Sequence, residues 1–222
     1  MICINSKNTE KSNSASIQKA IDEANASGEC MVVIEGGIWN VDEPVRLHSD
    51  IHVHLENASL IASDGCKRVF VNHNITLPRV RTIYGRQKGI TISGTENACI
   101  SAECGIYLYN AGDFIIEGLS FSGCKNAVEL VYANHFRIFD LDFQKCCNGV
   151  NIRAGSRNGF VNNLTGECLE NALIFDSREG EEIVNYNGPQ VENYVVRDIT
   201  TVCGKDKIRF EGEDVRFIET SI

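Results

Sequence analysis

Short runs in which hydrophobic and polar residues alternate extend along most of the chain, separated by Gly, Asn, Asp and Ser. In the N-terminal half these runs include CMVVIEG, DIHVHLENASLIAS and GITISG, and a period of two is the pattern of a β-strand with one buried face. One segment differs. In SASIQKAIDEANASG the residues Ile17, Ala20, Ile21 and Ala24 recur at helical spacing between a Ser and a Gly, which predicts an amphipathic helix at about residues 14–27.

From residue 105 onward the pattern becomes a repeat. The segments GIYLYNAGDFIIEGLSFSGCKN, AVELVYANHFRIFDLDFQKCCN and GVNIRAGSRNGFVNNLTGECLEN follow one another with a period of 22 to 23 residues. Each has two short strands, a polar turn and a Cys followed closely by an Asn, so Asn126, Asn148 and Asn171 recur at one place in the period. Short strands at this period, without helices between them, are typical of the coils of a parallel β-helix, in which equivalent residues stack about 4.8 Å apart.

The repeat predicts how the chain is organised. We expect a single parallel β-helix domain over residues 1–222, with clear coils at about 105–177. The N-terminal helix would cover a solenoid end that otherwise exposes core and strand edges. An insertion loop at about 177–193 is longer than the repeat needs, and long insertions in solenoids usually map to the functional face.

Strand alternation also sorts inward from outward positions, because successive side chains point to opposite faces. A fourth coil begins at Ala172, and KIRFEG from Lys207 fits the same register with Ile208 and Phe210 inward. The other inward positions are Ile106, Leu108, Val128, Leu130, Val150, Ile152, Leu173 and Phe175. The outward positions form two rows, one of Tyr109, Val131, Arg153, Asp176 and Glu211 and the other of Tyr107, Glu129, Asn151, Ile174 and Arg209.

The amino-acid composition indicates which classes of binding partner and which cellular compartment to expect. With 21 Lys+Arg against 30 Asp+Glu the net charge is −9, which argues against a nucleic acid or an anionic membrane as partner. The polar N-terminus resembles neither a secretory signal nor a membrane span, so we expect a cytoplasmic protein, or a secreted one if a leader precedes this sequence. The ten cysteines include Cys124, Cys146 and Cys168 within the repeat and no matched CxxC pairs, which favours buried, reduced thiols over a disulfide scaffold or zinc site.

The run SIQKAIDEANASGECMVVIEGGIWNVDEPVRLHSDIHVHLENASLIAS resembles the opening of pectin-lyase-like proteins, in particular the polygalacturonases of glycoside hydrolase family 28. There an AIQxAID helix leads into the first strands, and the likeness covers about residues 14–177. The resemblance implies an all-β fold, a right-handed parallel β-helix (solenoid) with an N-terminal capping helix. It also implies an inverting hydrolase whose acids come from motifs on neighbouring coils.

The catalytic motifs of that family are substituted in this chain. Where the family has an Asn-Thr-Asp motif, this chain has Cys146, Cys147 and Asn148. Where the family has an Asp-Asp pair one coil later, this chain has Glu170 and Asn171. The Arg-Ile-Lys position corresponds to Lys207, Ile208 and Arg209, and no His follows Arg153. The sequence therefore resembles a short, divergent polygalacturonase, and a glycoside hydrolase-like activity is the expectation that follows.

Candidate chemistry lies on the outward rows. Inverting glycosidases hold two carboxyl groups about 6.5–9.5 Å apart and retaining ones about 5–5.5 Å apart, and adjacent coils offer such distances. The candidate catalytic acids are Glu170, Asp176 and Glu211, of which Asp176 and Glu211 would be neighbours whose coupling raises one pKa. The candidate substrate-binding residues are Arg153, Arg209, Asn151, Glu129, Tyr107 and Tyr109, with Arg153 beside Asp176 and the tyrosines as stacking platforms. We expect an oligosaccharide or polysaccharide substrate, no cofactor and no metal.

Three alternatives remain open at this point. A non-catalytic solenoid that binds glycan or assembles with itself would explain the substituted motifs, and a dimer or trimer fits either interpretation because no capping helix follows the last coil. His52 and His54 face the same way in DIHVHLE, but without a third ligand a surface or capping role is favoured over a metal site. A Ca²⁺ site like that of pectate lyases would need a tighter Asp cluster than the sequence offers.

Overall fold

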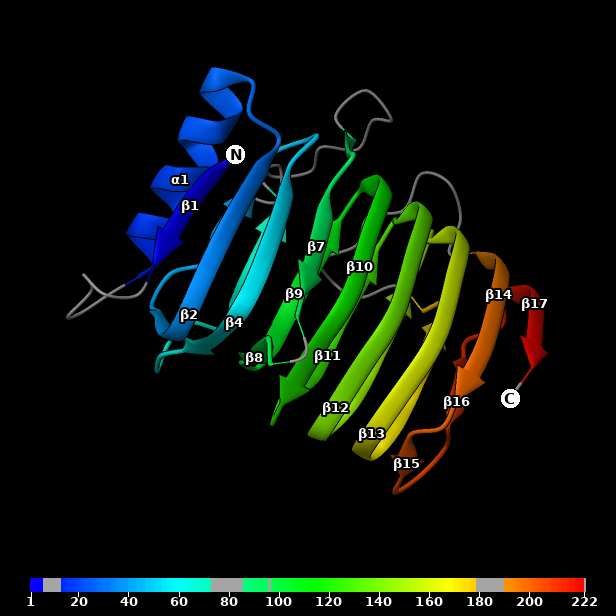
Figure 1. Cartoon of the computed structure of the whole chain (residues 1–222). Helices are drawn as coiled ribbons and strands as arrows, with labels where there is room; N and C mark the ends of the chain where they lie inside the picture. Colours follow the sequence, from blue (N-terminus) through cyan, green and yellow to red (C-terminus); the bar gives the residue numbers. More distant parts are fainter. Residues whose placement is uncertain (6–12, 73–85, 96, 179–189, 222) are drawn as a thin grey trace.

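The computed structural model describes residues 1–5, 13–72, 86–95, 97–178 and 190–221. Successive coils of parallel strands stack along one axis, and helix α1 (Ser14–Ser27) lies across the N-terminal end of the stack (Figure 1). The predicted parallel β-helix and its N-terminal helix are thereby confirmed. Within the described ranges, no helix is long and apolar enough to span a membrane.

Seventeen strands make up the described part of the solenoid. They are β1 (Ile2–Asn5), β2 (Met31–Val41), β3 (Val45–Leu47), β4 (His52–Ala62), β5 (Arg68–Asn72), β6 (Gln87–Lys88), β7 (Thr91–Gly94), β8 (Cys99–Ser101), β9 (Cys104–Tyr109), β10 (Ala111–Ser122), β11 (Asn126–Val131), β12 (Asn134–Arg153), β13 (Arg157–Asp176), β14 (Val191–Ile199), β15 (Val202–Cys203), β16 (Ile208–Glu211) and β17 (Val215–Ser221).

Each coil contributes strand segments to three sheets, which we call face one, face two and face three in chain order. Face one pairs the first half of β4 with β7, and β7 in turn with β10. Face two pairs the second half of β4 with β8, and β8 with the end of β10. Face three pairs β3, β5, β9, β11, the ends of β12 and β13, and β16, one after another. All of these pairings are parallel, as stacked coils require.

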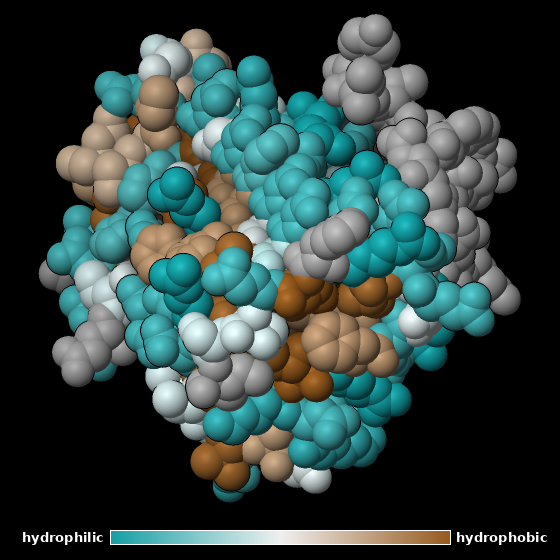
Figure 2. Space-filling model, turned by 90° about the vertical axis from the view of Figure 1, so that its right-hand side faces the viewer, coloured by the Kyte–Doolittle hydropathy of each residue, from teal (hydrophilic) through white to brown (hydrophobic). Residues whose placement is uncertain are grey.

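The core runs along the inside of the solenoid and is built from the alternating inward residues. Every inward position predicted from Ile106 to Phe175 is at most 1% exposed, because side chains from three sheets meet there. The two inward positions predicted on the last coil differ: Ile208 is only partly buried, and Phe210 has 54% of its surface exposed although it stacks on Phe175 with ring centroids 5.7 Å apart. Both lie on β16 in the last coil, at the end of the solenoid where Figure 2 shows hydrophobic side chains gathered.

Helix α1 is held at the N-terminal end by both packing and hydrogen bonds. Its apolar stripe, predicted from the spacing of Ile17 and its neighbours, is fully buried against the first coil. Ser14 Oγ accepts hydrogen bonds from the backbone N–H groups of Asp42 and Glu43, at 2.9 and 3.1 Å. Gly28 ends the helix at φ 74°, a conformation that costs glycine little.

The recurring Asn residues form a ladder at the start of face three. Asn148 Nδ2 donates to Asn126 Oδ1 at 3.2 Å, and Asn171 Nδ2 donates to Asn148 Oδ1 at 2.9 Å. Asn171 is 1% exposed, so its Nδ2 donor depends on this ladder, while its Oδ1 accepts from the backbone N–H of Asp206 at 3.4 Å. The repeat thus places three amides where each satisfies the next.

We expect Asn148→Ala to lower the free energy of unfolding by about 1–3 kcal/mol, because it removes two ladder bonds and leaves the buried amide of Asn171 without an acceptor. Urea unfolding followed by circular dichroism measures the change. Asn97→Ala is the matched control, since Asn97 is exposed and makes a single ladder bond to Asn57. An equal loss of stability in both variants would contradict the role given to the buried ladder.

The cysteines are free thiols; Cys124, Cys146 and Cys168 of the repeat are buried, and Cys147 is half-buried. Cys146 on β12 and Cys168 on β13 are register partners in the sheet, and Cys124 lies one coil earlier at the same place in the period. Burial raises the pKa of the Cys104 and Cys168 thiols well above the usual range. The raised pKa values keep the Cys104 and Cys168 side chains protonated and inert, as small hydrophobic residues.

A bulky thiol reagent applied at about pH 8 is therefore expected to modify Cys3 and Cys30, which are exposed, long before any buried cysteine. Peptide mass spectrometry after graded exposure gives the order of modification. In urea the buried thiols should react too. Rapid native modification of Cys124 or Cys168 would show that this part of the core is open.

Candidate functional site

Face three carries the outward rows predicted from the sequence, and the register is as expected. Tyr109, Val131, Arg153, Asp176 and Glu211 are successive partners across five strands. The neighbouring row pairs Tyr107, Glu129, Asn151, Ile174 and Arg209 in the same way. The candidate residues on both rows therefore share one surface of the solenoid.

Asp176 and Glu211 stand side by side and are bridged by Arg178. The Arg178 guanidinium holds Asp176 through Nε at 2.8 Å and Nη2 at 3.0 Å, and its Nη2 also contacts Glu211. Arg209 contacts Glu211 from the same strand through its own Nε. We call Asp176, Arg178, Arg209 and Glu211 the carboxylate cluster.

Burial within the carboxylate cluster is uneven. The side chains of Asp176 and Glu211 are only 10% and 14% exposed, whereas that of Arg178 is 60% exposed. The carboxylates are thus fixed in the surface, and the arginine that joins them lies over them. Such a bidentate contact fixes the orientation of a carboxylate. Sequence patterns did not indicate Arg178, because it follows the end of β13 where the repeat is interrupted.

Arg153 does not bind Asp176, although the two are register partners. Its Nη1 lies 2.9 Å from Glu129 Oε1, and both side chains are mostly buried. The expectation that Arg153 holds Asp176 is corrected in this respect, since Arg178 takes that position. Asn151 lies on the same strand as Arg153 and is the register partner of Glu129; its Oδ1 is buried and accepts no hydrogen bond within the described part of the chain.

The two tyrosines differ from the stacking platforms that were expected. Tyr107 is 5% exposed, and the guanidinium carbon of Arg68 lies 3.7 Å from its ring centroid, so a cation covers its ring. Tyr109 meets Tyr132 edge to face at 5.6 Å. Both belong to a small apolar cluster on the outside of face three, which includes Val71 and Val131. A sugar ring cannot use the covered face of Tyr107.

Glu170 lies apart from the other two acids. It precedes Asp176 by six residues of extended chain, a separation of up to about 20 Å. Its carboxylate is 3.0 Å from Lys205 Nζ, and it is 42% exposed. The structure therefore brings Asp176 and Glu211 together but does not add Glu170 to them. Most of the insertion loop predicted at about 177–193, residues 179–189, lies outside the described residues.

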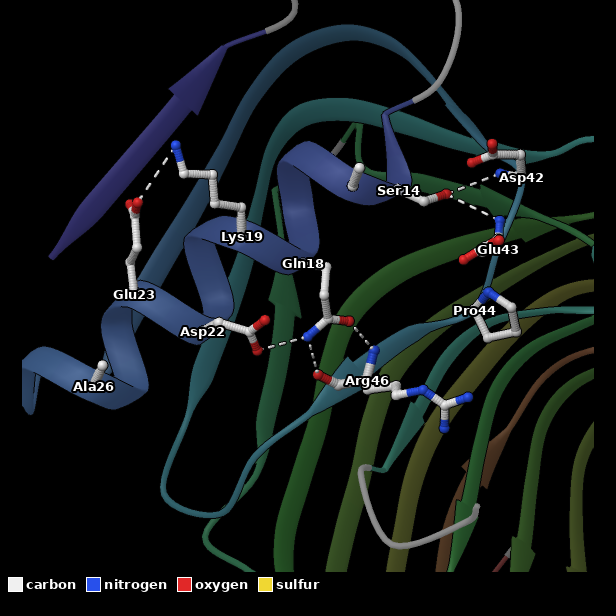
Figure 3. Close-up of a pocket in the computed structure, with 11 residues that line it drawn as sticks. Ser14, Gln18, Lys19, Asp22, Glu23, Ala26, Asp42, Glu43, Pro44 and Arg46 are labelled. Carbon is white, nitrogen blue, oxygen red and sulfur yellow. Dashed lines mark hydrogen bonds and ion pairs between the residues drawn. The ribbon is translucent and has the colours of Figure 1, made fainter.

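A cleft of about 940 Å³ lies at the N-terminal end, between α1 and β3 (Figure 3). Gln18 crosses it, accepting from the backbone N–H of Arg46 at 2.7 Å and donating to the carbonyl of Arg46 at 3.1 Å. Gln18 also donates to Asp22 at 2.9 Å. These contacts join the helix to the first coil, so the polar groups along the cleft serve to attach the cap.

Besides the carboxylate cluster and the polar side chains of the cleft, a cluster of two histidines and a serine lies on face one. Ser93 Oγ is 2.6 Å from His52 Nε2 and 2.7 Å from His54 Nδ1, and Ser93 is 5% exposed. Burial and the nearby His54 lower the pKa of His52, while Glu117 acts in the opposite direction. The sequence showed that the two histidines share a face, but it did not show that a serine 39 residues beyond His54 lies between them.

Comparison with known families gives a match over residues 60–195, more than half of the chain, to the model of the family described as periplasmic copper-binding protein (NosD). The chain belongs to the NosD family. Among curated protein sequences none matches it significantly.

Solved structures that share the fold of this NosD-family chain include three that act as useful comparisons. The first is a predicted glycosyl hydrolase from Parabacteroides merdae, with a TM-score of 0.59 and 12% identity over 99% of this chain and 98% of that one. The second is an iota-carrageenase complexed to iota-carrageenan fragments, with a TM-score of 0.64 and 11% identity over 96% of this chain and 57% of that one. The third is a family 28 exopolygalacturonase from Yersinia enterocolitica, with a TM-score of 0.60 and 13% identity over 99% of this chain and 58% of that one. The chain thus spans little more than half the length of the carrageenase and the exopolygalacturonase. At these identities the likeness shows the fold, and the resemblance to pectin-lyase-like proteins is confirmed at that level.

Arg178→Met should lower the free energy of unfolding by about 1–3 kcal/mol, since it keeps the side-chain stem but leaves Asp176 and Glu211 close together without the cation that bridges them. Chemical denaturation at low and high salt measures the loss. In the control Arg216→Met, an exposed pair with Asp214 is broken, and the expected change is below about 1 kcal/mol. No difference between the two variants would mean that the bridge over the carboxylates is not a structural element.

Proposed function

We propose that this NosD-family protein is a carbohydrate-active β-helix that binds an oligosaccharide along face three and cleaves it at Asp176 and Glu211. The observation that carries the proposal is the bridged pair of carboxylates on adjacent coils. Two fixed carboxyl groups are the minimum that glycoside hydrolysis requires. The carbohydrate-acting neighbours of the same fold support the substrate class, and they do not assign the residues.

The spacing of the pair favours one stereochemical course. Partner residues on adjacent strands lie about 4.8 Å apart, and one guanidinium nitrogen contacts both side chains. That separation is close to the roughly 5–5.5 Å of retaining glycosidases and below the 6.5–9.5 Å that an inverting enzyme needs for its water. One carboxylate would then attack the anomeric carbon as the glycosidic bond breaks, and the other, as the protonated carboxylic acid, would give its proton to the leaving oxygen. Water, deprotonated by that second group, would hydrolyse the glycosyl ester.

Arg178 controls access to the carboxylates in this proposal. As described, its side chain covers both acids and is the most exposed member of the carboxylate cluster. A sugar that enters would displace it and take over hydrogen bonds to the same oxygens. Because the arginine side chain is largely in water, moving it costs much less than moving a buried cation.

Recognition groups lie beside the carboxylate cluster. Asn151 Oδ1 is a buried acceptor without a described donor, and a sugar hydroxyl could supply the missing hydrogen bond. Glu129 and Arg153 on the adjoining coils form a charge-balanced pair that can bind hydroxyl groups from both sides. With equal numbers of arginines and carboxylates among these groups, the surface favours a neutral sugar over a polyanion.

A second function, glycan binding without turnover, is favoured by one observation. All three predicted acids are engaged in ion pairs, and Cys146, Cys147 and Asn148 stand where the resemblance places the first acid of polygalacturonases. In this case the same surface would recognise a sugar through fixed polar groups, and the carboxylate cluster would remain closed.

The description of the family also names copper, which proteins bind with imidazole and thiol side chains. No group of three metal-binding side chains converges within the described ranges. Two imidazoles do converge, at Ser93 on face one, so the donors of this chain match the preference of copper there and not at the carboxylate cluster. The proposed glycan chemistry uses no metal.

The test is a product assay on a panel of neutral and uronic-acid oligosaccharides, with binding measured in parallel by calorimetry. Asp176→Asn and Glu211→Gln should each reduce turnover at least 100-fold while glycan binding persists, because only the chemistry needs both carboxylates. Glu103→Gln, an exposed acid at another corner of the solenoid, is the control and should keep full activity. Binding without products would support the second function, and neither binding nor products would overturn both.

A further inference from the structure

We propose that two copies of this chain associate end to end through their last coils, around a twofold axis that sets β17 of one copy beside β17 of the other. The contact surface consists of strands β15, β16 and β17, which we call the open end. This inference does not depend on the glycan proposal, because it rests on the strand edges and apolar side chains of the open end, whatever face three binds.

The three strands of the open end each have one partner strand in the described chain. β17 pairs with β14, while β15 and β16 pair with β13. The described residues offer no strand to the opposite edges, so a row of backbone N–H and C=O groups there has no ladder partner among them. At the other end of the solenoid, α1 lies across the stack (Figure 1). The two ends therefore differ in what they offer to another molecule.

Hydrophobic side chains extend across the open end (Figure 2). Val202 and Phe210 are 68% and 54% exposed. Phe210 stacks on Phe175 at an interplanar angle of 10° with one ring face, so its other face is open to solvent. Ile208 and Ile218 pack against the core beneath them, and no layer of the described chain lies above them. Removal of such a surface from water drives association.

A second copy matches the open end in shape. A twofold axis across the middle of β17 reverses strand direction, so β17 meets its own counterpart antiparallel. The same axis sets β15 on face two against the partner's β16 on face three, again antiparallel. Three edges are thereby paired at once, which a single extended peptide cannot do. One turn of 22 to 23 residues also provides about the 20–30 residues that each side of a standard interface contributes.

The charges of the open end also favour a second copy. The whole chain has a net charge of −9, which opposes contact between most surfaces of two copies. An antiparallel pair of β17 strands centred between Arg216 and Glu219 sets each arginine opposite the partner's glutamate. Residues 202–221 are nearly balanced in charge, with Lys205, Lys207, Arg209 and Arg216 against Asp206, Glu211, Glu213, Asp214 and Glu219.

The dimer changes the surroundings of the carboxylate cluster. Arg209 and Glu211 lie on β16, which is the last strand of face three in the described chain. In a single copy the sheet ends beside them. In the dimer the partner's β15 continues the sheet past them, so the cluster lies near the middle of a solenoid of double length, with chain from both copies around it.

Sedimentation velocity of the 222-residue chain without glycan, from about 1 to about 100 µM, is the first test. We expect a species of twice the 24.6 kDa of one chain. Val202→Glu should weaken the dimer at least tenfold, because it places a carboxylate in the apolar contact. Ile38→Glu is the matched control, since Ile38 is 62% exposed on β2, and it should leave the dimer intact. Circular dichroism checks that both variants fold.

Two further measurements identify the arrangement. Small-angle X-ray scattering should show a dimer about twice as long as one chain and no wider, as end-to-end stacking requires. Hydrogen exchange at β17 should slow as the concentration rises, while exchange at β1 stays the same. The proposal is overturned if the parent chain stays monomeric, if Ile38→Glu disrupts the dimer as much as Val202→Glu, or if the dimer is no longer than one chain.

Discussion

The parallel stacking of one coil on the next, at about 4.8 Å, is the constraint on which the rest of this protein depends. It converts positions 22 to 23 residues apart in the sequence into neighbours in space, as the register of Asn126, Asn148 and Asn171 shows. A polar side chain at one position of the period can thus find its hydrogen-bond partner in its own counterpart. The same constraint brings two carboxylates together at Asp176 and Glu211.

Much of the fold could be predicted because the repeat is regular between residues 105 and 177. There the inward and outward positions follow from alternation alone, and the partners of Arg153 and Asp176 on face three were assigned correctly from the sequence. The helix was predictable for a different reason, since its apolar stripe and terminal Gly are local signals. Phe210 departs from this pattern because burial also needs a further coil, which strand alternation does not specify.

The contacts of the candidate sites were less predictable, because side chains do not have to pair with their register partners. Arg153 turns to Glu129 and leaves Asp176 to Arg178, a residue that lies beyond the end of a strand and therefore in no column of the repeat. Arg68 covers Tyr107 from β5, a strand outside the three clear repeats. Ser93 reaches the histidines only through the register of β4 and β7, which the irregular sequence around residues 86–95 does not show.

The ladder of asparagines has a consequence for how such a protein can change its length. Residues 127–148 form one complete turn of the solenoid, and the turns before and after it present an Asn, inward aliphatic residues and a Cys at equivalent places. Excision or duplication of such a turn would rejoin the chain with every column still continuous. The carboxylate cluster spans only the last two turns of face three, and the histidines lie on earlier ones. Insertion or loss of whole turns could therefore change the distance between the carboxylate cluster and the histidines in steps of about 4.8 Å, while each group keeps its own geometry.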